Sequence, residues 1–208
     1  MRAKARDMTR NPEHLLREAR AGDSAILGRL LELYRRYLTL LARVQIGQRL
    51  QGKVDAEDLV QETFLEAHQN IGRFRGASEG EFVRWLRQIL AANLSDLLRR
   101  YLGTQGRDVR LEREIADAFD RSSALLDRGL VAPQSSPSQQ AARREQAVLL
   151  ADALEQLPDD YRDVLVLRHL EGLTFPEVAA RMGRSLDSVE KLWVRALSRL
   201  RRALEPEP

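Results

Sequence analysis

The residues best suited to a chemical task lie in "EGLTFPEVAARMGRSLDSVEKLWVRALSRLRR", from Glu171 to Arg202. At about 100° per residue, the last part of this stretch forms a helix with one apolar side. That side carries Val189, Leu192, Trp193, Ala196, Leu197 and Leu200. The other side carries Asp187, Lys191, Val194, Arg195, Ser198 and Arg202. A helix docked by its apolar side and basic on the other suits the DNA major groove. An ordinary solvated helix of a bundle is the alternative.

The residues before this helix favour the DNA interpretation. Thr174 and Glu177 form a T-x-x-E capping box, and Pro176 lies in the first turn of the helix that they begin. Gly183 allows a sharp turn, and Ser185 is suited to cap the next helix. Two helices joined by a short glycine-containing turn are the helix-turn-helix signature.

No residue set in the chain suggests catalysis. His14, His68 and His169 lie far apart and show no metal-binding spacing. A glycine-rich phosphate loop and a nucleophile motif are both lacking, and without cysteine there is neither a disulfide framework nor a cysteine zinc site. We therefore expect no catalytic residue, no metal and no cofactor, so that the protein is not an enzyme.

The elements that must position these residues are helical. Apolar residues recur at steps of three and four, and no stretch alternates as a strand does. We expect an all-α protein of two small helical domains, over residues 11–101 and 141–204, joined by a long flexible linker over 102–140. Asp55 is the expected N-cap of a helix in the first domain. The linker contains "APQSSPSQQ" and also "LEREIADAF", which is compatible with a short helix.

The expected location is the cytoplasm. No apolar run approaches the roughly 18 residues of a membrane span. The basic N-terminal segment "MRAKARDMTRNPEHLLREAR" lacks the apolar core of a signal peptide. We therefore expect a soluble protein without membrane contact.

Three longer stretches resemble a known family. Residues 55–76, "DAEDLVQETFLEAHQNIGRFRG", and 82–100, "FVRWLRQILAANLSDLLRR", resemble the core domain of bacterial RNA polymerase sigma factors. Within the sigma-70 family, the resemblance is to the small extracytoplasmic-function (ECF, group 4) class. The stretch from Leu157 to Arg201 resembles the domain that reads the promoter −35 element. The resemblance implies a transcription initiation factor, monomeric when free, that binds core RNA polymerase and directs it to −10 and −35 promoter elements.

The resemblance also implies roles for residues of the first domain. Asp58, Gln61 and Glu62 match positions that bind the β′ clamp helices, and their spacing puts them on one helix face. An acidic solvated face is the alternative. Asn93 matches a position that contacts a flipped base, whereas Trp85 is first a core residue and second a base-stacking platform. The residues expected to hold −10 DNA are Arg73, Arg75, Arg84, Arg87, Asn93, Arg99 and Arg100.

In the second domain the resemblance implies contacts to −35 DNA and to the β flap of the polymerase. The expected DNA-binding residues are Arg184, Ser185, Ser188, Lys191, Arg195 and Arg202. Glu190 stands where relatives often carry a basic or polar residue, so it either accepts from a cytosine amino group or points away from DNA. The family also implies an anti-sigma protein as a partner.

Two other functions compete with this interpretation. A conventional helix-turn-helix regulator would bind a palindromic operator as a dimer. A sigma-like protein without melting activity is the other alternative. Housekeeping sigma factors carry two adjacent tryptophans in the segment that melts DNA, whereas here Trp85 is followed by Leu86.

Overall fold

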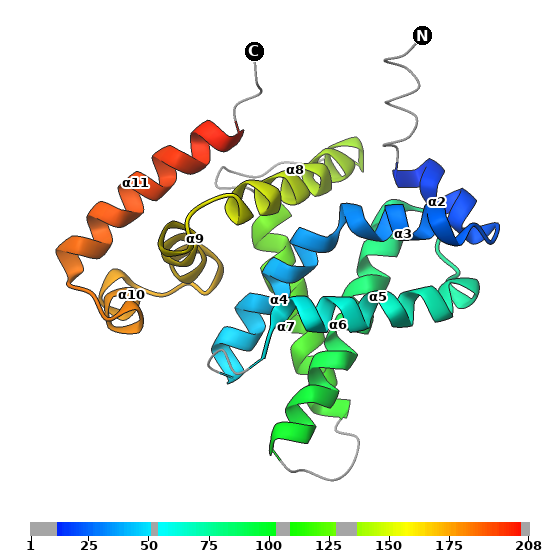
Figure 1. Cartoon of the computed structure of the whole chain (residues 1–208), viewed down its shortest axis with the longest axis horizontal. Helices are drawn as coiled ribbons and strands as arrows, with labels where there is room; N and C mark the ends of the chain where they lie inside the picture. Colours follow the sequence, from blue (N-terminus) through cyan, green and yellow to red (C-terminus); the bar gives the residue numbers. More distant parts are fainter. Residues whose placement is uncertain (1–11, 51–53, 103–108, 128–136, 205–208) are drawn as a thin grey trace. The chain divides into compact units, whose positions relative to one another are not determined.

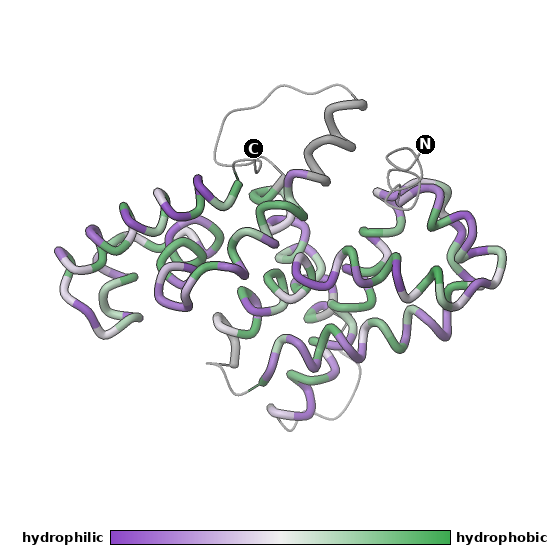
Figure 2. The backbone as a smooth tube through the Cα atoms, turned by 45° about the horizontal axis from the view of Figure 1, so that its top comes forward, coloured by the Kyte–Doolittle hydropathy of each residue, from purple (hydrophilic) through white to green (hydrophobic). Residues whose placement is uncertain are grey.

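The structure is a computed structural model that describes residues 12–50, 54–102, 109–127 and 137–204. Every regular element in these ranges is a helix, which confirms the expected all-α class (Figure 1). The chain divides into two compact units, Met1–Phe119 and Asp120–Pro208. In Figure 2 the helices alternate between hydrophilic and hydrophobic residues along their length, as amphipathic helices do.

The first unit is built mainly from five helices that share a leucine-rich core. They are α2 (Pro12–Arg20), α3 (Ser24–Leu33), α4 (Arg35–Leu50), α5 (Ala56–Asn70) and α6 (Glu79–Leu102), with a short 3-10 turn, η1 (Ile71–Arg73), after α5. The Asp55 carboxylate accepts the Glu57 backbone N–H at 2.8 Å and so confirms the expected N-cap of α5. The core of the first unit includes the fully buried Leu16, Leu27, Leu30, Leu38, Phe82, Leu86 and Leu90.

An aromatic cluster holds the start of α6. Phe74 lies with its ring centroid 5.7 Å from that of Phe82 and 5.1 Å from that of Trp85. The Tyr34 ring packs on Phe82, and its hydroxyl donates to the Glu79 carboxylate at 2.8 Å. Because Tyr34 ends α3 and Glu79 begins α6, this bond fixes two helix ends together.

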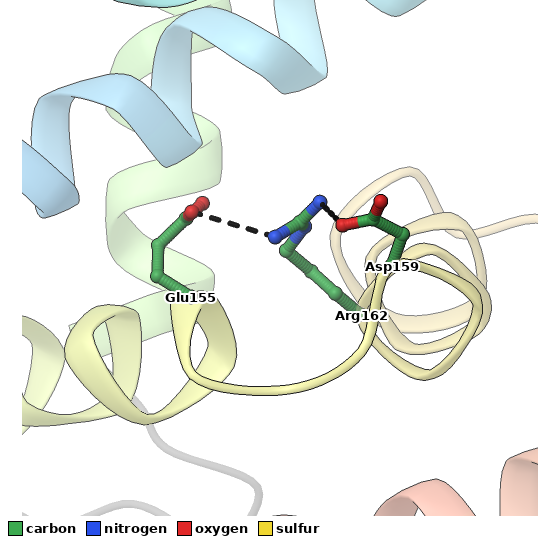
Figure 3. A network of polar contacts seen from close by, with 3 residues as sticks. All are labelled: Glu155, Asp159 and Arg162. Atoms are coloured by element: carbon green, nitrogen blue, oxygen red, sulfur yellow. Dashed lines mark hydrogen bonds and ion pairs between the residues drawn. The ribbon is translucent and has the colours of Figure 1, made fainter.

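The second unit holds α8 (Pro137–Glu155), α9 (Asp159–Leu165), the π-helical turn η2 (Val166–Leu170), α10 (Phe175–Met182) and α11 (Leu186–Leu204). Pro158 separates α8 from α9, and an arginine bridges the corner (Figure 3). Arg162 donates to Glu155 at 3.5 Å and to Asp159 at 2.5 Å, with only 12% of its side chain exposed. Two carboxylates therefore share one nearly buried cation.

The segment 102–140, which we expected to be a long flexible linker, is helical in its middle part. Residues Val109–Asp127 form one helix, α7, and α8 already begins at Pro137. The suspected short helix in "LEREIADAF" thus extends to 19 residues. Ile115, Phe119 and Leu126 are buried along one side of α7, and this burial stabilises a helix whose other residues are largely polar. Residues 103–108 and 128–136 lie outside the described part of the chain.

Candidate nucleic-acid interface

The helix-turn-helix forms where the sequence predicts it. The Glu177 carboxylate accepts both the backbone N–H and the hydroxyl of Thr174 at 2.7 Å, and these bonds lower the pKa of Glu177. Gly183 adopts the left-handed conformation, with φ 63°. The next amide, of Arg184, donates to the Ala179 carbonyl at 3.0 Å, which closes the turn as a Schellman motif does.

Helix α11 leaves this turn with its two sides as predicted. The Ser185 hydroxyl accepts the Ser188 backbone N–H at 3.3 Å and caps the helix. Trp193 is half-buried, and its indole N–H donates to His169 Nε2 at 3.0 Å while its ring meets Phe175 edge-on. The fully buried residues are Val189, Leu192, Ala196 and Leu200. The exposed side shows Asp187, Glu190, Lys191, Val194, Arg195, Ser198 and Arg202.

The expected −35 residues differ in how freely their side chains can reach DNA. Lys191 pairs with Asp187 at 2.8 Å, and both side chains remain mostly exposed. Arg184 forms an ion pair with Asp160 of α9. Arg195 and Arg202 are exposed and have no side-chain partner among the described residues. Of the two serines, Ser185 serves as the cap and Ser188 is half-buried.

The acidic face of α5 is also formed. Asp58, Gln61 and Glu62 are all exposed, whereas Leu59 and Phe64 on the other side are buried. The structure adds a residue that the sequence reasoning missed. Leu65 is 57% exposed and follows Asp58 by seven positions, which places it on the same face. The sequence could have indicated this residue, because a position seven residues after Asp58 returns to the same face of a helix.

The loop before α6 is held in one shape by a carboxylate. Glu81 accepts the backbone N–H groups of Ala77 at 2.9 Å and Ser78 at 3.0 Å, and also the Ser78 hydroxyl at 2.9 Å. These bonds lower the pKa of Glu81. Arg20 of α2 also donates to the carbonyl of Gly76, at 2.9 Å. Side chains from α2 and from α6 therefore both hold the loop that precedes α6.

The expected −10 arginines fall into two groups. Arg75, Arg84 and Arg100 are exposed, with no hydrogen bond or ion pair to another described residue. The other three are already bonded within the protein: Arg73 donates to Asn70 at 3.4 Å, Arg87 donates to the Tyr37 hydroxyl at 3.2 Å, and Arg99 pairs with Asp96.

Asn93 shares a side of α6 with only some of these arginines. Its amide donates to the Thr63 hydroxyl of α5 at 3.4 Å, and the side chain is half-buried. Arg84 comes nine positions earlier, about half a turn away at ~100° per residue. Arg100 comes seven positions later and returns to nearly the same side. The structure thus groups Asn93 with Arg100 and separates both from Arg84.

Trp85 is half-buried, and its ring lies 5.1 Å from that of Phe74 and 5.8 Å from that of Phe82. No group of three or more metal-ligating side chains occurs within the described ranges. Within the same ranges, none of the helices has the length and apolarity to cross a membrane.

Comparison with known proteins agrees with both halves of the chain. Residues 33–102 match the model of Sigma-70 region 2, and residues 147–200 match that of Sigma-70, region 4. The RNA polymerase sigma-H factor of Pseudomonas aeruginosa is 32% identical over 155 residues, which cover 73% of this chain and 74% of that protein. The chain belongs to the sigma-70 family of RNA polymerase sigma factors.

Further relatives place this sigma factor in the ECF class. The ECF RNA polymerase sigma-E factor of Escherichia coli K12 is 31% identical over 152 residues, covering 73% of this chain and 75% of that protein. The ECF RNA polymerase sigma-E factor of Haemophilus influenzae is 28% identical over 92% of this chain and 94% of that protein. A solved RsbN–BldN complex aligns at 25% identity over 90% of this chain and 97% of that chain, with a TM-score of 0.32.

Family membership defines the role of this sigma factor in outline. It is a transcription initiation factor. Sigma factors, the family to which it belongs, are not enzymes. The comparisons do not favour the conventional dimeric regulator.

Proposed function

We propose that this sigma factor binds core RNA polymerase through α5 and directs it to promoters by reading −10 DNA at α6 and −35 DNA at α11. The observation that carries the proposal is the outer side of α11. That side is exposed and basic, it lies opposite an apolar side on which Val189, Leu192, Ala196 and Leu200 are buried, and most of it falls inside the match to Sigma-70, region 4.

For the −35 element, Arg195 and Arg202 supply unpaired guanidinium groups that can clamp phosphates or guanine edges. Lys191 is held only by Asp187, in a pair whose side chains are 65% and 73% exposed. Exposed pairs of this kind contribute little stability, so DNA can take Lys191 from Asp187 at small cost. Arg184 is exchangeable in the same way, since its pair with Asp160 is also on the surface.

For the −10 element, the exposed Arg75, Arg84 and Arg100 hold phosphates of the unwound strand. Asn93 receives a flipped base, with Arg100 on the same side of α6. The 3.4 Å bond from Asn93 to Thr63 is long, so the amide loses little when a base edge replaces the Thr63 hydroxyl. Arg73, Arg87 and Arg99, whose side chains already bond to other residues of the protein, act mainly by supporting this surface.

The polymerase side of the proposal rests on α5. Asp58, Gln61 and Glu62 form its exposed polar face, and Leu65 adds an apolar contact beside them. This face docks on the β′ clamp helices, whereas the second unit meets the β flap. We assign residues 11–101 to polymerase binding and −10 recognition, and 141–204 to −35 recognition.

The protein acts in the cytoplasm as a monomer when free, without catalysis, metal or cofactor. An anti-sigma protein is the partner expected to hold it inactive. The family relationship supports this point.

The test is co-elution of the purified protein with sigma-free core RNA polymerase. The wild type should co-elute, and a Gln61→Ala, Glu62→Ala double variant should bind about tenfold more weakly or worse, as loss of central interface residues does. The matched control removes an exposed amide and an exposed carboxylate elsewhere, in a Gln156→Ala, Glu190→Ala variant. This control should co-elute like the wild type.

The opposite outcome is equally clear. A protein that fails to co-elute and instead binds duplex DNA alone as a dimer would be an operator-binding regulator. If both double variants bound core RNA polymerase equally weakly, α5 would not be the specific docking face. The conclusion that the wild type associates with the polymerase would still stand.

A further inference from the structure

Val194 is an exposed apolar residue in the middle of the basic side of α11. Its side chain is 56% exposed, the most of any large apolar residue on this helix among those the structure describes. Leu186 and Leu204, the other two exposed ones, lie at the two ends of the helix. Val194 is therefore at the centre of the surface proposed to enter the DNA groove.

Valine at this position contributes little to the fold. Most of it is exposed, whereas Leu192 and Ala196, two positions before and after it, are buried. A β-branched side chain also loses rotamer freedom in a helix, so alanine would favour α11 more. The reason for a valine here must then be sought in what the surface contacts.

The exposed groups near Val194 on this side of α11 are polar, and some are already engaged, whereas Leu197 one turn later is half-buried. The Ser198 hydroxyl donates to the Val194 carbonyl at 3.0 Å, so its proton is turned back onto the helix. Lys191 leans toward Asp187, one turn before Val194. Glu190, four positions earlier, and Arg195, the next residue, are exposed. An exposed apolar side chain thus lies on the same exposed stretch of helix as a carboxylate and a guanidinium.

Only one base offers an apolar group to such a side chain. In the major groove, guanine, adenine and cytosine present donors and acceptors, whereas thymine also presents its C5-methyl group. Valine has no polar side-chain atom, so its contact can reward a methyl group and nothing else. We propose that Val194 selects thymine at one position of the −35 element by packing on the C5-methyl group. This inference rests on the proposed function of α11.

The experiment removes the methyl group and leaves the base pair unchanged. Holoenzyme assembled from the full chain and core RNA polymerase first selects its promoter from a library with a randomised upstream element. Each thymidine of the selected element is then replaced in turn by deoxyuridine, which lacks the methyl group. At one thymidine of the element, we expect the replacement to weaken binding of the wild-type holoenzyme about fourfold. This factor corresponds to the free energy of burying one methyl group.

Two variants complete the cycle. In Val194→Ala, which favours the helix and should fold, the same replacement should change binding by less than about 1.5-fold, because the methyl group has lost its partner. Leu204→Ala removes an exposed apolar side chain from the far end of the same helix. It should keep the wild-type fourfold loss.

Two results would overturn the assignment. In the first, no thymidine is sensitive to the replacement. In the second, the sensitivity persists in Val194→Ala, so that another group reads the methyl. A holoenzyme that assembles but selects no upstream element would instead contradict the proposed −35 function, and the thymine contact with it.

Discussion

At Gly76 a hydrogen atom stands where any other residue would place a carbon. A Cβ built there would lie 2.3 Å from Phe74 Cζ and 2.8 Å from Glu81 Cβ. The Phe74 ring cannot swing aside, since it is buried against Phe82 and Trp85. The Glu81 Cβ is fixed by the helix backbone and by the bonds of its carboxylate to the loop. The loop before α6 therefore requires glycine at this point.

A Gly76→Ala substitution should destabilise the first unit by about 1–3 kcal/mol, the usual cost of forcing an extra group into a packed site. Urea unfolding measures the loss. Gly72→Ala is the matched control, because a Cβ there would meet no atom within 4 Å. A Gly76→Ala protein as stable as the Gly72→Ala protein would show that the loop can shift to admit a methyl group.

At the scale of elements, η2 and α11 are joined by one hydrogen bond between side chains. The Trp193 indole N–H donates to His169 Nε2, which must be unprotonated to accept it. Burial lowers the pKa of His169, and the neighbouring positive charge of Arg168 lowers it further. The half-buried Glu171 nearby has a raised pKa, again from burial. The folded protein therefore favours the neutral imidazole.

This pair predicts a pH dependence with a definite sign. Because the pKa of His169 is lower in the folded state than its ordinary 6.5, the unfolded chain takes up the proton first as pH falls. The contribution of His169 to the free energy of unfolding of the second unit should be constant above that value and decline below it, until the folded pKa is passed. Urea unfolding followed by the NMR signal of the Trp193 indole N–H measures this at a series of pH values.

Two histidine substitutions serve as comparisons for this titration. His169→Gln keeps an acceptor for Trp193 but cannot titrate, so most of the decline near neutral pH should vanish. His68→Gln, on the exposed side of α5, should retain it. A decline of the same size in His169→Gln would assign the pH dependence to another group.

At the scale of the whole molecule, a formal net charge of +3 says little about DNA binding, because charged residues make up 31% of the chain. What matters is where unpaired cations lie. The side chains without a hydrogen bond or ion pair to another described residue include Arg75, Arg84 and Arg100 near the −10 site and Arg195 and Arg202 on α11. Each is available to displace counterions from a phosphate.

Salt dependence tests this distribution of charge. An Arg195→Gln holoenzyme should bind its selected promoter with a slope of log affinity against log salt that is less steep by about one. Arg29→Gln, an exposed substitution on α3, should leave the slope unchanged. If Arg195→Gln also leaves the slope unchanged, Arg195 contacts no phosphate and its role is limited to base edges or absent.

The helix-turn-helix was determined almost entirely by the sequence. Its capping box, its left-handed Gly183 and its Ser185 cap involve residues within a few positions of one another. The same holds for the Asp55 cap of α5 and for the two sides of α11. Interactions of this range depend on local backbone geometry, which residue type and spacing specify directly.

Only the tertiary structure decided which side chains are available. The helix α7 is stabilised by burial of Ile115, Phe119 and Leu126, which the polar segment around them did not reveal. The direction of Asn93 toward Thr63 depends on how α5 packs against α6. The exposure of Leu65 and the obligate glycine at position 76 likewise arise from packing. Burial is a property of contacts between residues distant in sequence, and the spacing along one helix does not contain it.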